Sequence, residues 1–435
     1  MADSQRRRLL AALIEVVSER GYLKTTVADV IARAGVSRRA FYEHFPNREQ
    51  CFLEAYDTVI ATVAGEAADA YRSAGDAQRG AEAAIGALFE RAIESPQVVP
   101  LVLVEIGAVR PGGFARRERL IGAYERQLGE ALGLTVDPAG APNPLLRAIV
   151  GGLNEVLFAR VRSHRERELR TLAPELVRWL HCYYPAPQAV LSVGDPLLAR
   201  ASSVGSSGGR APGSLSLVQV SGRRRGLRGE QNGSHSFVVH NQRERILDAV
   251  ANLSAAKGYA AVTVRDIADG AAVSLDAFYG NFAGKEDAFL VAYEVGHGKS
   301  LAVVERAFAS EADWRLGVRA GIAALCDFLA SEPTFAHISL VDARIASRRS
   351  AELARKGVKA YSHMVLAGVQ KAPTGGGPPE VRVEAVIGGL FELCLTYTLR
   401  KRAAALPGLV CSATYFALAP FIGAQEAARV ATEAD

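Results

Sequence analysis

Cysteine is scarce in this 435-residue sequence, and no C-x-x-C pair occurs. The five cysteines, Cys51, Cys182, Cys326, Cys394 and Cys411, are odd in number and far apart along the chain. This pattern argues against a disulfide framework and against a zinc site, and it indicates thiols kept reduced. The histidines are equally scattered, so we expect no metal site.

The sequence also lacks a long hydrophobic run and a large excess of one charge. Its most apolar stretch, 98–109, is interrupted by Pro100 and Glu105 and is too short to cross a bilayer. No apolar segment follows the basic residues 6–8, so we expect no signal peptide, no membrane association and a cytoplasmic protein. The formal charge of +5 is compatible with DNA binding but does not indicate it.

Catalytic patterns are absent as well. We find no nucleophile–base pair, no phosphate-binding loop and no paired carboxylates, so we expect no enzyme and name no catalytic residue.

What the sequence does contain is a repeat. Gly21-Tyr22 recurs as Gly258-Tyr259 at an offset of 237, and 17 of the 36 residues from 21 to 56 are identical at that offset. The same offset aligns residues 151–153 with 388–390, both Gly-Gly-Leu. Near the ends the alignment is expected to slip to 233, which pairs Pro174 with Pro407. We therefore predict two duplicated domains.

The predicted domains cover 1–188 and 241–435. Residues 189–240, between them, are rich in Ser, Gly and Arg and have few regularly spaced apolar residues, which is typical of a flexible linker. Elsewhere the hydrophobic spacing is helical, and no strand alternation stands out. The predicted fold class is therefore all-α, with two tandem helical domains.

Each domain is expected to begin with a helix-turn-helix, at about 26–45 and 263–282. In the first copy, Thr26 can cap a helix N-terminus, and Gly35 stands where a tight turn needs a positive φ. Ser37 then caps a second short helix. Phe41 and Phe45 lie four residues apart on it and are expected to point inward together.

The outer face of this second helix carries Arg38, Arg39, Tyr42 and His44. Exposed arginines at a helix N-terminus suit a major groove and its phosphates. Arg48, at the start of the next helix, could bind a further phosphate.

At these residues the sequence resembles the TetR/AcrR family of bacterial repressors. The family signature appears as Thr26-Val27-Ala28-Asp29-Val30, then Ala34-Gly35-Val36-Ser37-Arg38-Arg39-Ala40-Phe41-Tyr42-Glu43-His44-Phe45, and it recurs from Thr263 to Phe282. The resemblance implies, in each domain, a three-helix DNA-binding head on a helical body that binds a small molecule and dimerises. It further implies a repressor that binds double-stranded operator DNA. An unidentified small-molecule effector would weaken this binding by moving the heads apart.

The residues expected to contact DNA come from both copies. In the first they are Thr26, Ser37, Arg38, Arg39, Tyr42, His44 and Arg48, and in the second they are Thr263, Ser274, Tyr279, Asn281 and Lys285. The effector cavities are expected within 80–160 and 317–397, with no contacting residue named.

The second copy differs from the first at the turn glycine and at the two arginines of the outer helix face. Gly35 becomes Ala272, and Arg38-Arg39 becomes Leu275-Asp276. Residues 1–50 contain nine Lys/Arg and six Asp/Glu, a net charge of +3, whereas 238–287 contain five and seven, a net charge of −2. Because phosphate neutralisation supplies most non-specific DNA affinity, the second head is expected to bind DNA more weakly or to read another sequence.

Helices expected at 145–163 and 381–402 are apolar around more than one face, which predicts a partner outside their own domains. Their glycine pairs would allow close backbone approach. The residues expected at this dimerisation contact are Ile149, Gly151, Gly152, Leu153 and Val156, and Val386, Gly388, Gly389, Leu390 and Leu393.

We expect an intramolecular pseudo-dimer, since a flexible linker of ~50 residues spans roughly 40 Å. Homodimerisation between chains is the alternative. An alternative function requires the same fold: the chain would be a regulatory module that binds a ligand or a protein, and its DNA-binding helices would be degenerate.

Overall fold

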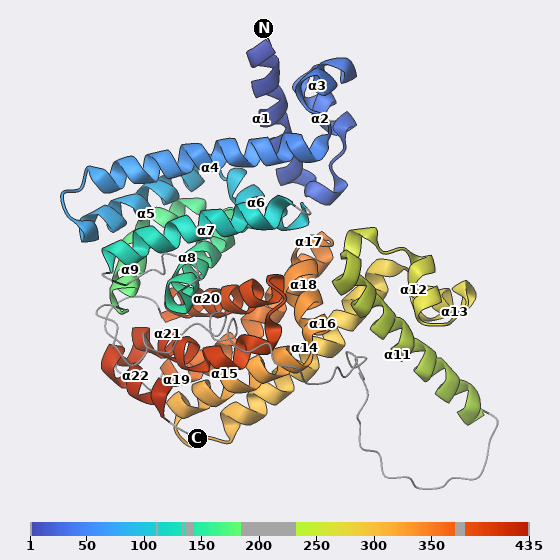
Figure 1. Ribbon diagram of the computed structural model, residues 1–435. Coiled ribbons are helices and arrows are strands. Elements are labelled where there is room, and N and C mark those ends of the chain that lie inside the picture. Colours follow the sequence, from blue (N-terminus) through green and yellow to red (C-terminus); the bar gives the residue numbers. More distant parts are fainter. Residues whose placement is uncertain are drawn as a thin grey trace, which may run out of the picture.

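The computed structural model describes residues 2–109, 112–132, 134, 143–183, 232–369 and 379–433. Over these residues the chain is helical and has no strand, which confirms the all-α prediction (Figure 1). Most of the predicted linker lies outside the described residues. Its last part, 232–240, belongs to the first helix of the second half, so the linker ends earlier than 240.

The first half contains a head of three helices and a body of six. In chain order the helices are α1 (Ala2–Arg20), α2 (Val27–Ala34), α3 (Arg38–His44), α4 (Arg48–Arg72), α5 (Ala77–Glu94), α6 (Val98–Leu103), α7 (Gly112–Ala131), α8 (Pro144–Arg162) and α9 (Leu169–His181). Short 3-10 turns η1 (Tyr22–Lys24), η2 (Glu105–Ala108) and η3 (Glu166–Glu168) connect them.

The second half repeats this order. Its helices are α11 (Asn232–Lys257), α12 (Val264–Gly270), α13 (Leu275–Asn281), α14 (Lys285–Ala309), α15 (Trp314–Ser331), α16 (Pro333–His337), α17 (Ala343–Ile345), α18 (Arg348–Ala360), α19 (Ser362–Val369), α20 (Pro379–Leu399), α21 (Val410–Ile422) and α22 (Ala424–Thr432), with η4 (Tyr259–Ala261), the π-helical η5 (Ile338–Asp342) and η6 (Ala403–Leu409). Helices α3, α4 and α5 begin and end 237 residues before α13, α14 and α15.

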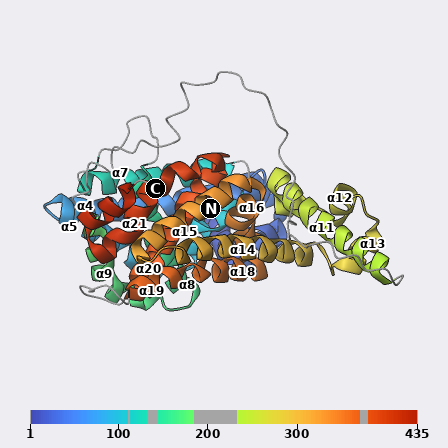
Figure 2. The ribbon, with the colours of Figure 1, turned by 90° about the horizontal axis from the view of Figure 1, so that it is seen from below.

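Helices α8 and α20 pack against each other and join the two bodies (Figures 1 and 2). A Cβ added to Gly151 would lie 2.2 Å from Cβ of Glu392, and one added to Gly388 would lie 2.2 Å from Cβ of Glu155. Each of these two positions also lies 3.3 Å from the carbonyl oxygen of the other glycine. The contact is therefore reciprocal, and it requires glycine on both helices.

The second glycine of each pair makes an equally close contact. A Cβ on Gly152 would meet the carbonyl oxygen of Ala385 at 2.5 Å, and one on Gly389 would meet that of Ala148 at 2.4 Å. Most of the other predicted contact residues are buried, namely Ile149, Val156, Val386 and Leu393. Gly151, Gly152, Gly388 and Gly389 themselves are buried as well.

Leu153 and Leu390 depart from the prediction. They are only half-buried, and they line cavities inside the first and second body, respectively. The physical reason is helix geometry, because the residue after Gly152 or Gly389 is rotated by about 100° away from the contact face.

The predicted slip of the repeat to an offset of 233 is wrong. Pro174 lies inside α9, whereas Pro407 lies in η6, before α21 begins. Trp179 packs where a Cβ on Gly152 would lie, and Phe416 occupies the matching place at Gly389, so these two residues, 237 apart, are equivalent. The offset of 237 therefore continues through the last helices, and the paired prolines are a local coincidence.

Residues 403–422, which form η6 and α21, make up the one described segment long and apolar enough to cross a membrane. Its mean hydropathy is 1.6, and 67% of its most apolar part is buried. Helix α21 packs against α15, α8 and α20. The segment is therefore accounted for as a core helix.

Candidate nucleic-acid interface

The first head forms the predicted helix-turn-helix from local signals. The Thr26 side chain accepts a hydrogen bond from the Asp29 backbone N–H, and the Asp29 carboxylate accepts one from the Thr26 backbone N–H at 2.9 Å. This capping box starts α2. Gly35 ends it in the left-handed region, at φ 61° and ψ 43°, as the turn requires. Ser37 then caps α3 by accepting from the Ala40 N–H.

Helix α3 divides into a buried face and an exposed face. Phe41 and Phe45 are 0% and 2% exposed, as predicted. The Arg39 side chain is 90% exposed and pairs with Glu43 at 2.9 Å, and Tyr42 is 47% exposed. The α3 face that points away from the core is thus cationic and aromatic.

The second head repeats the motif with a strained turn. Thr263 and Asp266 form the same capping box, and Ser274 caps α13. Ala272 stands at the Gly35 position and keeps a positive φ of 52°. The turn therefore keeps its left-handed geometry, although a Cβ is disfavoured there.

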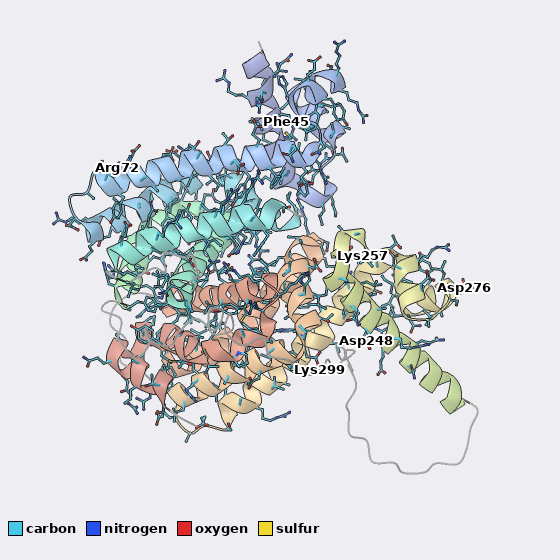
Figure 3. All side chains as sticks on the ribbon, viewed as in Figure 1. Phe45, Arg72, Asp248, Lys257, Asp276 and Lys299 are labelled. Carbon is cyan, nitrogen blue, oxygen red and sulfur yellow. The ribbon has the colours of Figure 1, made fainter. Side chains whose placement is uncertain are left out.

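The outer face of α13 is less cationic. Leu275 and Tyr279 are exposed, and Asp276 lies on the side of the second head away from the bodies (Figure 3). In the described part of the chain, the exposed large hydrophobic side chains are Tyr42, Leu275 and Tyr279, all on α3 or α13. Exposed apolar groups concentrated on two equivalent helices indicate a partner surface.

From the sequence, Leu275 is noted only as the replacement of Arg38, and it is not among the residues expected to contact DNA. The structure shows its side chain exposed at the position of Arg38, where an apolar group could contact a thymine methyl. The sequence could have indicated this exposure, because Leu275 directly follows the cap residue Ser274, just as Arg38 follows Ser37.

Arg48 and Lys285 have a positioning role that their place in the sequence did not indicate. The Arg48 guanidinium donates to the carbonyl oxygens of Tyr22 and Thr25 and lies 4.2 Å from the Tyr22 ring centre. Lys285 donates to the carbonyls of Tyr259 and Val262 and lies 4.2 Å from the Tyr259 ring. Both cations therefore hold the turn before α2 or α12, and their phosphate contacts stay predictions.

Four further residues predicted to contact DNA make contacts within the heads themselves. The hydroxyls of Thr26 and Thr263 donate to the capping carboxylates at 2.7 and 2.6 Å. The Asn281 amide donates to the Ala277 carbonyl at 2.8 Å, which leaves its carbonyl oxygen available. His44 is half-buried beside Phe45.

Each body contains small cavities lined by its central helices. In the first half two adjoining cavities of about 70 and 80 Å³ share Ile85, Leu88 and Tyr124. In the second half a cavity of about 80 Å³ is lined by residues that include Tyr293 and His297. The predicted ranges omitted α4 and α14, which supply part of each wall, because nothing in their sequence separates cavity-facing from core-facing residues.

Comparison with known proteins supports this interpretation of the heads. The N-terminal domain model of bacterial regulatory proteins of the tetR family matches residues 9–55 and again 246–292. One curated relative, the HTH-type transcriptional activator FasR of Mycolicibacterium smegmatis, is 30% identical over 88 residues, which are 20% of this chain. The match spans 40% of the length of that relative.

Solved structures similar to this chain include two named FadR. The fatty acid degradation regulator FadR of Bacillus halodurans is 17% identical, with a TM-score of 0.36, and the match covers 40% of this chain and 94% of that one. FadR of Bacillus subtilis, in complex with stearoyl-CoA, is 21% identical, with a TM-score of 0.37, and covers 41% and 98%.

The likeness to this family lies in the two N-terminal matches. Each match spans a capping box, a left-handed turn and a recognition helix of the described geometry. The chain therefore carries the N-terminal domain of the bacterial regulatory proteins of the tetR family twice.

Proposed function

We propose that the chain is a repressor that binds DNA mainly through α3, with α13 as a weaker second reader, and that a small molecule bound in the bodies releases it. The observation that carries this proposal is the exposed face of α3, where two arginines and a tyrosine point away from the core. Arginine can bind a guanine edge with two hydrogen bonds, and it also neutralises phosphate.

Long helices offer a path from cavity to head. Helix α4 has 25 residues and is therefore about 37 Å long. Its N-terminal part, with Cys51 and Phe52, belongs to the core of the first head, and Ile60 and Val63 line a cavity further along. A ligand that displaces these two side chains would tilt the helix and move the head. Helix α14 has the same length and a matching cavity.

A second link joins the first head to its body. The Glu105 carboxylate in η2 accepts a hydrogen bond from the Tyr22 N–H at 2.6 Å. Burial raises the pKa of Glu105. A shift of η2 would therefore be transmitted to the turn before α2.

We further propose that the functional unit is an intramolecular pseudo-dimer. Ion pairs between the two halves support this arrangement, because they are not symmetric. Arg117 binds Glu392 at 2.5 Å, and Arg160 binds Glu384 at 2.8 Å. Across the same junction, Arg400 binds Glu118 at 2.6 Å.

Pairing of two identical halves would lose the Arg160–Glu384 and Arg400–Glu118 pairs, although two first halves would keep a carboxylate, Glu155, at the place of Glu392. Glu384 corresponds to Arg147 at the offset of 237, so two first halves would place Arg160 opposite a second arginine. Two second halves would place Glu384 opposite Tyr397, the counterpart of Arg160. Like charges facing each other in a poorly solvated contact are costly, which favours pairing of unlike halves.

The sign of regulation is a separate question. The family resemblance favours repression, whereas the curated relative is named as an activator. In vitro transcription from a bound promoter, with the protein added in increasing amounts, is expected to show decreasing transcript. An increase would show activation while leaving the DNA-binding proposal intact.

A gel-shift assay with genomic fragments at two salt concentrations tests DNA binding itself. Changing both Arg38 and Arg39 to Ala should weaken specific binding by about 1–3 kcal/mol for each arginine that binds a base edge with two hydrogen bonds, and should reduce the salt dependence. The matched control changes Leu275 and Asp276 to Ala and is expected to have a smaller effect. Equal weakening from both pairs of changes would contradict the dominant role of α3.

If the wild-type chain bound no DNA fragment at either salt concentration, the alternative function without DNA binding would be favoured. In that case the bodies would serve as a regulatory module for another ligand or protein. The acidic Asp276 on α13 is the observation that favours this alternative for the second half.

A further inference from the structure

The cavities of the two bodies occupy equivalent places in the fold. At the offset of 237, most residues that line the second-half cavity have a counterpart that lines a first-half cavity. Among the shared positions, Leu88 matches Leu325, and Tyr124 matches Tyr361. The two cavities can therefore be compared residue by residue.

Their chemistry differs along one wall. In the first half this wall is apolar and consists of Ile60, Val63, Val102 and Leu157. In the second half the same four positions are His297, Ser300, Ser339 and Cys394. An imidazole and two hydroxyls therefore replace hydrocarbon at matched places. On another wall the difference is reversed, since Asn154 in the first half matches Phe391 in the second.

The polar groups of the second cavity are held in position. The Ser300 hydroxyl lies 2.9 Å from the Tyr361 hydroxyl, and Ser300 is 1% exposed. The His297 ring stacks on Tyr293 at 5.7 Å between ring centres, and it lies nearly perpendicular to the Tyr361 ring at 5.5 Å between centres. Within the described part of the chain no hydrogen bond reaches the His297 imidazole, which lines the cavity.

The imidazole is suited to an uncharged partner. Burial lowers the pKa of His297, so the ring is neutral near pH 7 and offers one donor and one acceptor. No Lys, Arg, Asp or Glu is among the residues that line this cavity. A ligand that brought a net charge would therefore lose its hydration without gaining an ion pair.

We propose that the two halves recognise different effectors, and that the second-half cavity takes an uncharged hydrophobic molecule carrying a hydroxyl group, such as a phenol or an alcohol, which hydrogen-bonds to His297 and Ser300. The first-half cavity takes an apolar group at the same place. The chain then reads two chemically distinct signals, one through each body. This inference rests on the proposed function only in treating the bound molecule as an effector.

Phenol and toluene form a matched pair of probes, because a hydroxyl replaces a methyl group on the same ring. Titration of the full chain, followed by the NMR signal of the His297 imidazole, is expected to show phenol binding about tenfold tighter than toluene, the effect of one to two net hydrogen bonds. The variant H297I/S300V places the first-half residues in the second cavity and should abolish this preference. The converse variant I60H/V63S should create a second phenol-preferring site.

Because H297I/S300V has no imidazole at this position, its binding is followed by the signals of the labelled probes. His297→Gln keeps a donor and an acceptor and is expected to retain the preference, which separates hydrogen bonding from collapse of the cavity. Equal affinities for phenol and toluene in the wild-type chain would overturn the inference. Unchanged phenol binding in H297I/S300V would overturn it too.

The gel-shift assay without ligand keeps the two proposals apart. If the chain prefers phenol but binds no DNA, the result supports this inference and contradicts the proposed function. A chain that binds DNA but does not distinguish the probes would contradict this inference alone.

Discussion

At the scale of single residues, Ala272 is the position where the second head departs most from favourable geometry. It holds a φ of 52°, which costs an L-residue with a Cβ roughly 1–2 kcal/mol. Ala272→Gly should therefore stabilise the second head by about 0.5–1 kcal/mol once the greater entropy of unfolded glycine is counted. Hydrogen exchange of the α12 and α13 amides in the full chain would measure this.

The reciprocal change is its matched control. Gly35→Ala puts a Cβ at φ 61°, so it should destabilise the first head by about 1 kcal/mol. If Ala272→Gly left exchange in the second head unchanged or faster, the alanine turn would not be strained.

At the scale of elements, the packing between α8 and α20 depends on glycine. Gly151→Ala would place a Cβ 2.2 Å from Cβ of Glu392, and neither backbone can withdraw easily, since Gly388 makes the reciprocal contact. Overpacking of this kind typically costs about 1–3 kcal/mol. Chemical denaturation of the full chain should show this decrease in the free energy of unfolding.

Gly86 provides a control for the helix propensity of the substitution. It lies on α5, and a Cβ added there would meet nothing within 4 Å. Gly86→Ala should therefore stabilise the chain by about 0.5–1 kcal/mol. A Gly151→Ala variant as stable as Gly86→Ala would show that the close approach is not maintained in solution.

At the scale of the whole molecule, an intramolecular pseudo-dimer should sediment near its chain mass of 46.2 kDa at micromolar concentration. Glu384→Arg reproduces the first-half residue and places an arginine against Arg160, so it should weaken pairing within the chain. Reduced thermal stability or association into larger species should follow. The double change R160E/E384R reverses the pair and should restore much of the wild-type behaviour.

A clean 92 kDa wild-type species, twice the chain mass, would instead support homodimerisation. Insensitivity of the chain to Glu384→Arg would argue against the ion pair as a determinant of assembly.

Operator symmetry is a second property of the whole molecule. Two identical recognition helices favour a palindrome, with half-sites about 34–36 Å apart or at multiples of that spacing. Here the paired helices present Arg38 and Arg39 on one side and Leu275 and Asp276 on the other. In vitro selection should therefore return unlike half-sites, the one read by α3 contributing more energy. A perfect palindrome with equal halves would point to two first heads from separate chains.

The heads were predictable because their signals are local. A capping threonine, a turn glycine and a cap serine act within a few residues, so sequence alone located α2, α3 and their repeats. The role of Arg48 was not predictable in the same way. Its partners, the carbonyls of Tyr22 and Thr25, lie more than 20 residues away, and an arginine at a helix start is equally suited to a phosphate.

The sequence by itself determined the duplication, the all-α class, the two helix-turn-helix motifs and their difference in charge, because these follow from identity at one offset and from short-range backbone chemistry. Only the tertiary structure decided that Leu153 and Leu390 line cavities, that α4 and α14 reach from cavity to head, and that Arg160 meets Glu384. The reason is physical: helical hydrophobic spacing predicts that a residue is buried, but it does not predict which residues pack against it. That partner is selected by packing between segments hundreds of residues apart.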